Sequence, residues 1–344
     1  MQIGRGWKVA AGAAGLAFGL RRAQAYGWFR GKVVLITGGS RGLGLVLARE
    51  LVRRGAKIAV CARDGAELER ARHELAAGGA EVLAIACDVS VAAQASSLLE
   101  QTLHRFGHLD VLINNAGIIQ VAPLESMGLP DYREAMEINY FGLLHTSLAA
   151  LPHMRGRRKG SIVNICSIGG AVAIPHLAAY SASKFAAVDF SEALGAEARP
   201  AGIRVTTILP GVLRTGSFVN ALYKGNRERE VAWFAAGASL PGASVAAGRA
   251  ARRILRACAL GEPYVTIGLP AKVLRVVHAL APGAFSRLSS LVGRLLPAAA
   301  GGAGPGEAAE PGWQHRPPPS ALTKLGDQAA RQNREVPWAP PSPV

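Results

Sequence analysis

Short apolar runs alternate with longer amphipathic segments from residue 31 to about residue 267. The runs are apolar at nearly every position, which is typical of strands that are covered on both faces of a sheet. They are residues 33–37, 58–61, 82–86, 111–114, 162–166, 205–209 and 264–267. Helix-length segments fill the gaps, and this alternation predicts a parallel sheet built from right-handed βαβ crossovers. We therefore expect one doubly wound α/β domain of about seven strands over residues 31–267.

The N-terminal segment, residues 1–30, has a different pattern. Twelve uncharged, largely apolar residues, 9–20, lie between Arg5 and Lys8 on one side and Arg21 and Arg22 on the other. Such a run is too short to cross a bilayer as a helix, and arginines after the run do not fit a cleaved or twin-arginine signal. Two alternatives stay open: an amphipathic helix that lies on a membrane, or one that packs on the protein's own surface.

Two further amphipathic segments follow the last predicted strand, within residues 268–297, and Pro282 and Gly283 separate them. Their apolar faces carry Val273, Val276, Val277, Leu280, Leu288, Leu291, Val292 and Leu295, and their polar faces carry Lys272, Arg275, Arg287 and Arg294. This pattern fits a lid over an apolar pocket, a membrane surface, or helices packed on the sheet. Residues 298–344 are rich in Ala, Gly and Pro, which predicts a disordered tail.

The chain carries 39 Lys and Arg against 23 Asp and Glu, a net charge of +16. The whole excess lies in residues 1–30, 149–160 and 241–297. The densest basic run, residues 155–159, falls between a predicted helix and a strand and has no interleaved aromatic residues. We therefore interpret it as a solvated loop and expect no nucleic-acid partner.

The four cysteines, Cys61, Cys87, Cys166 and Cys258, are far apart and show no paired spacing, which argues against disulfides and a zinc ribbon. A reducing compartment fits best, so we expect a cytoplasmic protein, with peripheral membrane association as the open alternative. Only His104 and His108 have the spacing of a helical metal pair, and Gly107 lies between them. We expect no metal site.

The first predicted strand ends in the turn Thr37-Gly38-Gly39-Ser40-Arg41-Gly42-Leu43-Gly44, and an amphipathic helix follows it. A strand, a glycine turn and a helix start place backbone N–H groups and the positive end of a helix where a pyrophosphate can bind. Glycines fit because a Cβ would block the ligand or the tight turn. The pattern favours a dinucleotide site in a Rossmann-type fold, although glycine-rich turns also occur for purely geometric reasons.

Further motifs lie at the ends of the later strands or on the adjoining helix, where an open α/β sheet binds its ligands. They are Asp88 with Val89, Asn114-Asn115-Ala116-Gly117, Ser167, Tyr180-Ser181-Ala182-Ser183-Lys184 and Pro210-Gly211-Val212-Leu213-Arg214-Thr215. With the glycine turn, these motifs make the sequence similar to the short-chain dehydrogenase/reductase family over residues 31–267.

Tyr180 and Lys184 also have a direct chemical interpretation. Four residues apart on a helix, they share one face, and an ammonium near a phenol favours the phenolate. We expect this to lower the pKa of the phenol toward neutrality, so that the hydroxyl exchanges a proton with a carbonyl oxygen. Ser167 supplies a hydroxyl that holds the same oxygen.

The resemblance implies the rest of the site. Asn139 completes a catalytic tetrad by holding a water in a proton relay through Lys184, Asp88 and Asn115 lie around the adenine and the strand ends, and Thr215 lies near the nicotinamide amide. The expected cofactor-binding set is Thr37, Gly38, Ser40, Arg41, Gly42, Leu43, Gly44, Arg63, Asp88, Val89, Asn115, Ala116, Gly117, Tyr180, Lys184, Pro210, Gly211, Val212 and Thr215. The resemblance also implies a homo-oligomer paired through the helices that carry the asparagine and tyrosine motifs.

The end of the second predicted strand bears on the choice of cofactor. An enzyme that uses NAD typically has a carboxylate here for the ribose hydroxyls, whereas a 2′-phosphate is attracted by arginine. This strand ends with Ala62 and Arg63, and Arg41 is a second cation in reach. The sequence favours NADP(H), and NAD is the less favoured alternative because a one-residue shift would make Asp64 the ribose ligand.

The expected function is an NADPH-dependent carbonyl reductase. The expected partner is a small carbonyl or alcohol, and we favour a lipophilic one because residues 217–240 carry Phe218, Leu222, Tyr223, Trp233 and Phe234. The alternative is a non-catalytic dinucleotide-binding sensor or scaffold protein, a class that commonly lacks part of the tetrad.

Overall fold

The computed structural model describes residues 24–299, 304–315 and 320–336. Its centre is a parallel sheet of seven strands in the order β11-β7-β6-β4-β1-β2-β3. The strands are β1 (Val33–Thr37), β2 (Lys57–Ala62), β3 (Val82–Ala86), β4 (Val111–Asn114), β6 (Gly160–Ile165), β7 (Ile203–Pro210) and β11 (Tyr264–Ile267). This confirms the predicted Rossmann-type sheet, and each predicted strand overlaps an observed one.

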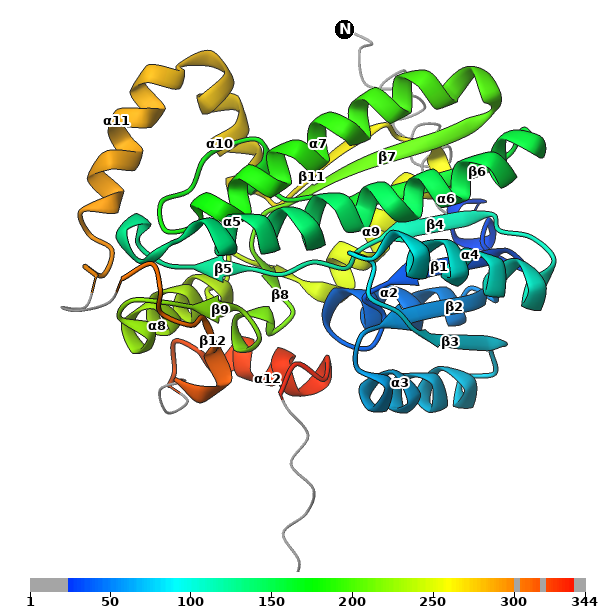
Figure 1. Cartoon of the computed structure of the whole chain (residues 1–344), viewed down its shortest axis with the longest axis horizontal. Coiled ribbons are helices and arrows are strands. Elements are labelled where there is room, and N and C mark those ends of the chain that lie inside the picture. Colours follow the sequence, from blue (N-terminus) through cyan, green and yellow to red (C-terminus); the bar gives the residue numbers. More distant parts are fainter. Residues whose placement is uncertain (1–23, 300–303, 316–319, 337–344) are drawn as a thin grey trace, which may run out of the picture.

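Helices cover both faces of the sheet (Figure 1). One layer holds α2 (Gly42–Val52), α3 (Gly65–Ala77) and α9 (Ala247–Leu260), and the other holds α4 (Ala92–Phe106), α6 (Gly142–Gly156) and α7 (Ala178–Ala198). Successive side chains of a strand point to opposite faces. Val34 and Ile36 of β1 accordingly join the core under the first layer, and Val33 and Leu35 join the core under the second.

The strand order reverses direction at β1, because the chain continues to β2 on one side and β4 lies on the other. In a doubly wound sheet, ligands bind at this switch point, outside the carboxyl ends of the strands. Between β4 and α6 the chain forms α5 (Leu129–Met136) and a π-helical turn, η2 (Glu137–Phe141). A single π turn inside a helix is frequently found at functional sites.

Smaller elements extend the carboxyl edge of the sheet. They are β5 (Gln120–Val121), β8 (Leu213–Arg214), η5 (Ser217–Val219), β9 (Leu222–Tyr223), α8 (Arg227–Ser239) and β10 (Val245–Ala246). β9 pairs in parallel with β5, and β10 pairs in parallel with β8. The predicted substrate segment, residues 217–240, therefore forms an ordered cover over this edge.

The C-terminal stretch differs from its prediction. Residues 304–315 and 320–336 are not a disordered tail, because β12 (Glu310–Pro311) pairs antiparallel with β9 and α12 (Lys324–Gln332) packs against α8. Figure 1 shows both beside the cover, at the red end of the chain. Ala329 and Ala330 of α12 are buried. The Ala-, Gly- and Pro-rich composition predicted disorder for these residues. The small side chains of α12 instead allow this helix to pack closely against α8.

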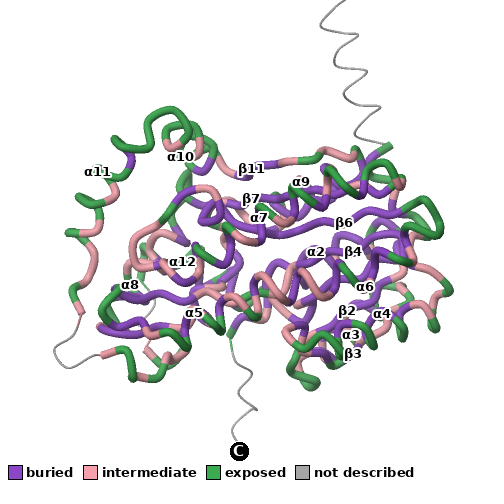
Figure 2. Tube along the Cα trace, turned by 45° about the horizontal axis from the view of Figure 1, so that its top comes forward, coloured by how far each residue is buried: buried purple, intermediate pink, exposed green. Residues whose placement is uncertain are grey.

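Two helices, α10 (Leu269–Leu280) and α11 (Pro282–Gly293), project from the body after β11. Their predicted apolar faces are exposed, as Figure 2 shows, and only Ala271 and Phe285 are buried in them. Of the N-terminal segment only residues 24–30 are described, where Ala25 and Phe29 join the core, so its predicted apolar run lies outside the described residues. Within the described ranges, no helix has both the length and the apolar character needed to cross a membrane.

Candidate active site

A cavity of about 610 Å³ runs along the carboxyl ends of the central strands, from the glycine turn to the start of α7. Its walls include most of the residues that the sequence predicts for the site. These are Gly38, Ser40, Arg41, Gly42, Leu43, Arg63, Asp88, Val89, Asn115, Ala116, Gly117, Ser167, Tyr180, Lys184, Pro210, Gly211, Val212 and Thr215. The remaining three, Thr37, Gly44 and Asn139, lie behind the wall and support it.

Backbone contacts hold the glycine turn in place. Thr37 is buried, and its Oγ1 accepts hydrogen bonds from the N–H groups of Asn115 and Ala116, both 3.0 Å long. The Asn115 side chain donates to the carbonyl oxygens of Thr37 and Gly38. A Cβ on Gly44 would collide with the Gly38 carbonyl oxygen, so this glycine allows α2 to begin close to β1.

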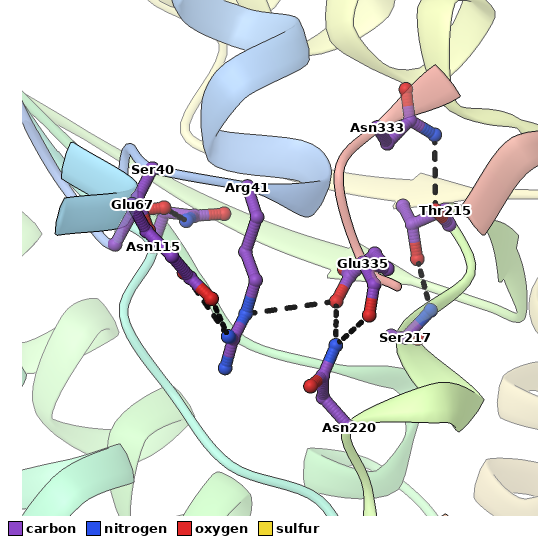
Figure 3. Close-up of polar contacts among 10 residues, drawn as sticks. Ser40, Arg41, Glu67, Asn115, Thr215, Ser217, Asn220, Asn333 and Glu335 are labelled. Atoms are coloured by element: carbon purple, nitrogen blue, oxygen red, sulfur yellow. Dashed lines mark hydrogen bonds and ion pairs between the residues drawn. The ribbon is translucent and has the colours of Figure 1, made fainter. Parts of the chain in front are cut away.

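Arg41, in the glycine turn, lies between two carboxylates (Figure 3). Its Nη1 donates to Glu67 Oε1 at 2.9 Å, and its Nε lies 3.7 Å from Glu335 Oε2. Ser40 Oγ also donates to Glu67, at 3.3 Å. A cation that lies beside the N-terminus of α2 therefore already binds anionic oxygens in this structure.

The end of β2 forms the other side of the glycine turn. β2 ends at Ala62, and Arg63 is exposed at the cavity wall. Asp64 lines the cavity too, but its carboxylate caps α3 by accepting the Glu67 N–H at 2.8 Å. Asp88 accepts hydrogen bonds from the backbone and the hydroxyl of Ser90. The Asp64 carboxylate thus has a structural role as a helix cap.

Ser167, Tyr180 and Lys184 converge at the far end of the cavity. Ser167 follows β6, and its Oγ accepts the Gly169 N–H at 3.0 Å. Tyr180 and Lys184 lie one turn apart in the first turns of α7. Lys184 Nζ lies 5.8 Å from the centre of the Tyr180 ring and donates to the Ile165 carbonyl at 3.3 Å. The cavity wall therefore combines two hydroxyl groups with a buried ammonium.

Burial decides the protonation of these groups. It raises the pKa of the Tyr180 phenol to about 12, and a hydrogen bond from Ser167 only partly offsets this. Burial also lowers the pKa of Lys184. The expected lowering of the phenol pKa by Lys184 is therefore wrong for this structure, because desolvation by burial is the largest effect and raises that pKa. At neutral pH, Tyr180 carries its proton.

Asn139 lies on the π turn behind Lys184 and is fully buried. Its Oδ1 accepts the Ile118 N–H at 2.9 Å, and its Nδ2 donates to the Ile118 carbonyl and to Ser183 Oγ. Both polar atoms of the side chain therefore bind protein groups, and they join the loop after β4 to α7.

The cover makes the substrate end of the cavity apolar. Ile119, Ile174, Leu177, Leu222 and Phe234 contribute to this wall. Of the five apolar residues singled out from the sequence, only Leu222 and Phe234 line it. Phe218 and Tyr223 are buried in the cover, where the Tyr223 hydroxyl donates to the Phe218 carbonyl, and Trp233 Nε1 donates to Glu230.

Two acidic residues beside Arg41 were missed by sequence reasoning. Glu67 and Glu335 both line the cavity and both contact Arg41. Glu67 follows the Asp64 cap by three residues, so its position beside the glycine turn could have been found from the helix start. Glu335 gives no such signal, because it lies 294 residues after Arg41 in a stretch whose composition predicts disorder.

Several known proteins are similar to this chain in sequence or in fold. Residues 32–224 match the family model of short chain dehydrogenases. The chain is 38% identical over 207 residues to "Dehydrogenase/reductase SDR family member 7B" of Mus musculus, covering 59% of this chain and 64% of that protein. It is 37% identical over 249 residues to "11-beta-hydroxysteroid dehydrogenase A" of Sesamum indicum, covering 69% and 68%.

A crystal structure of a short-chain dehydrogenase from Streptomyces avermitilis has the same fold, with a TM-score of 0.66 and 31% identity. The alignment covers 77% of the present chain and 98% of the Streptomyces avermitilis chain. The match to the mouse relative spans less than two thirds of that protein. The family model, however, covers more than half of the present chain, and so the chain belongs to the short-chain dehydrogenase/reductase family.

Proposed function

We propose that the protein is an NADP(H)-dependent oxidoreductase that interconverts a carbonyl and a secondary alcohol. The observation that carries this proposal is the convergence of Ser167, Tyr180 and Lys184 on one cavity wall, with the glycine turn at the other end of the same cavity. A nicotinamide dinucleotide supplies or accepts the hydride when it is bound there. Its fit is supported by a cavity of about 610 Å³ and by Arg41, which already holds carboxylate oxygens.

The three side chains have separate roles in this proposal. The Tyr180 phenol, protonated at neutral pH, donates its proton to the oxygen of a carbonyl substrate. Ser167 Oγ holds that oxygen in place. The buried Lys184 ammonium stabilises negative charge on the phenol oxygen as the proton leaves, and Asn139 positions a water that returns a proton through Lys184.

The preference for NADP(H) rests on the basic residues beside the glycine turn. Arg41 and Arg63 both line the cavity, and the strand that ends at Ala62 offers no carboxylate at that position. A 2′-phosphate would accept charge-assisted hydrogen bonds from these guanidinium groups. Glu67 opposes this preference, since the phosphate must replace it as the partner of Arg41.

The substrate end of the cavity favours a lipophilic carbonyl or alcohol. Its wall is formed by Ile119, Ile174, Leu177, Leu222 and Phe234. The name of the Sesamum indicum relative points to a hydroxysteroid, and an apolar, multi-ring or long-chain compound would match such a wall.

A membrane surface is the proposed source of such a substrate. The exposed faces of α10 and α11 carry Val276, Leu280 and Leu291, and Leu295 is exposed just after α11. Exposed cations accompany them, with Lys272 and Arg287 on the two helices and Arg294 directly after α11. Apolar side chains with flanking cations fit an anionic lipid surface. A second copy of this chain, paired through η2 and α7, is the other proposed partner.

The test of the function is direct. Purified protein is incubated with NADPH or NADH and a panel of steroid ketones, long-chain ketones and small ketones, and nicotinamide absorbance is followed. We expect NADPH to be consumed fastest with the lipophilic ketones. Binding of NADPH without turnover on any carbonyl or, in reverse, any alcohol would instead indicate a dinucleotide-binding protein without catalysis.

A further inference from the structure

The C-terminal strap, residues 333–335, contacts the part of the glycine turn that begins α2. The Gly42 N–H donates to the Asn333 carbonyl at 2.8 Å. The Glu335 carboxylate lies so close to Gly42 that a Cβ there would collide with its Oε1. A backbone N–H and the positive end of a helix are the groups that bind a dinucleotide phosphate in such turns, and here protein oxygens occupy them.

The strap is anchored by hydrogen bonds to two other segments of the site. Asn220 Nδ2 donates to Glu335 Oε2 at 2.7 Å, and Asn333 Nδ2 donates to the Thr215 carbonyl at 3.0 Å (Figure 3). Asn333 and Glu335 are both buried, each with about 6% of its surface exposed. Buried polar groups with satisfied hydrogen bonds indicate that the strap docks in one specific conformation.

The same groups would serve an anionic ligand. Arg41 lies 3.7 Å from Glu335 and is one of the two cations that the proposed function assigns to the 2′-phosphate. Thr215, whose carbonyl the strap occupies, also lines the cavity. The Glu335 carboxyl group fills the space beside Gly42 and is a partner of the cation that would attract phosphate oxygens.

We propose that the C-terminal strap competes with the dinucleotide phosphates for Arg41 and the start of α2, with Glu335 as the competing side chain. The strap must leave, or shift away from Gly42 and Arg41, before the cofactor reaches full contact. The apparent affinity for NADPH is then reduced by the fraction of molecules with the strap docked. Glu335 thereby becomes a determinant of cofactor affinity that lies outside the family's matched segment, residues 32–224.

This inference rests on the proposed placement of the dinucleotide at the glycine turn, and the experiment separates the two. The dissociation constant of NADPH is measured by fluorescence for the full chain, for Glu335→Ala and for Glu307→Ala. Glu307 is the matched control, because it is a carboxylate of the same C-terminal stretch that pairs with Arg227. We expect Glu335→Ala to tighten NADPH binding by roughly fivefold or more and Glu307→Ala to leave it unchanged.

Amide hydrogen exchange supplies the second measurement. NADPH should protect residues 38–45, which tests the placement, and should increase exchange in residues 330–336, which tests the strap. Lack of protection at 38–45 overturns the placement of the cofactor. If that protection is present, then unchanged or weaker NADPH binding by Glu335→Ala, or unchanged exchange at 330–336, overturns the strap.

Discussion

At the level of single residues, the site contains groups whose pKa values are shifted by burial. Tyr180 and Lys184 occupy the spacing that the sequence indicates, yet the Lys184 ammonium points to the Ile165 carbonyl and desolvation keeps the phenol protonated. A protonated phenol is suited to giving a proton to a developing alkoxide. The structure therefore favours Tyr180 as the acid of a reduction.

The first prediction concerns that proton. Tyr180→Phe removes the donor and keeps the ring, so we expect turnover to fall by about 10²- to 10⁴-fold with the NADPH dissociation constant almost unchanged. Steady-state kinetics and fluorescence titration check the two quantities. Tyr26→Phe, at an exposed tyrosine remote from the cavity, should leave both unaltered. Retained turnover in Tyr180→Phe would remove Tyr180 from the role of acid.

A second prediction concerns the choice of cofactor. Arg63 is exposed at the cavity wall, where its guanidinium would bind a 2′-phosphate but has no partner group on NADH. Loss of a hydrogen bond to a charged group costs about 2 kcal/mol, so Arg63→Ala should weaken NADPH binding roughly thirtyfold. NADH binding should change little. Arg72→Ala, which removes a cation of α3 paired with Glu69, is the control. Equal losses for both cofactors would refute the assignment.

At the level of elements, the pattern of apolar positions predicts the sheet because the information is local. A central strand run such as Val33–Thr37 is buried on both faces, so its sequence alone shows its environment. Most motifs of the candidate site are also found from the sequence, since they follow a strand directly or, like Tyr180 and Lys184, lie at the start of the next helix. The same reasoning fails for Glu335, whose contacts with Arg41 and Asn220 join segments that are far apart along the chain.

α12 was missed for a related reason. Ala329 and Ala330 are buried, and Ala330 lies close to Gly216. A Cβ on Gly216 would collide with the backbone of Ala330. Close packing of small residues requires a complementary surface, and composition alone does not reveal that surface. An Ala- and Gly-rich segment therefore carries the same sequence signal whether it is docked or disordered.

The third prediction concerns the docking of the C-terminal strap. Burial raises the pKa of the Glu335 carboxyl to about 7, against opposing effects of Arg41 and Asn220, and Glu67 raises it further. A free glutamate titrates near pH 4.3. The docked strap is therefore more stable when Glu335 is protonated. This stabilisation of the docked strap is complete below about pH 4.3 and is lost as the pH rises through about 7.

We expect amide protection of residues 333–336, corrected for intrinsic exchange, to fall between about pH 5 and pH 8. Glu335→Gln, which stays neutral and keeps the shape of the side chain, should make this protection independent of pH. Hydrogen exchange at several pH values measures both. A parallel decline in the wild type and in Glu335→Gln would show that another group controls the strap.

At the level of the whole molecule, the distribution of charge and apolar surface is uneven. The basic excess falls partly in residues 241–297, the region that includes α10 and α11. Leu280 of α10 is 81% exposed, and Leu295, two residues after the end of α11, is 86% exposed. Apolar patches of this kind mark sites of interaction, and the neighbouring cations favour a surface of anionic lipid.

The fourth prediction tests that surface by co-sedimentation with vesicles of phosphatidylcholine alone or with phosphatidylserine. The full chain should bind the anionic vesicles more strongly, and raised salt should weaken this binding because it screens the cations. Leu280→Glu with Leu291→Glu should reduce the bound fraction several-fold, since it places charge on the apolar face. Leu124→Glu, at another exposed leucine away from α10 and α11, is the control.

A chain that lacks residues 1–28 separates the contribution of the N-terminal segment from that of α10 and α11. If the two helices provide the contact, this shortened chain still binds and its Leu280→Glu, Leu291→Glu form does not. Equal binding by all forms, or binding that does not depend on lipid charge, would contradict the proposal that α10 and α11 contact an anionic lipid surface. The apolar cavity would then have to receive its substrate from solution, and the ketone panel should favour smaller, more soluble compounds.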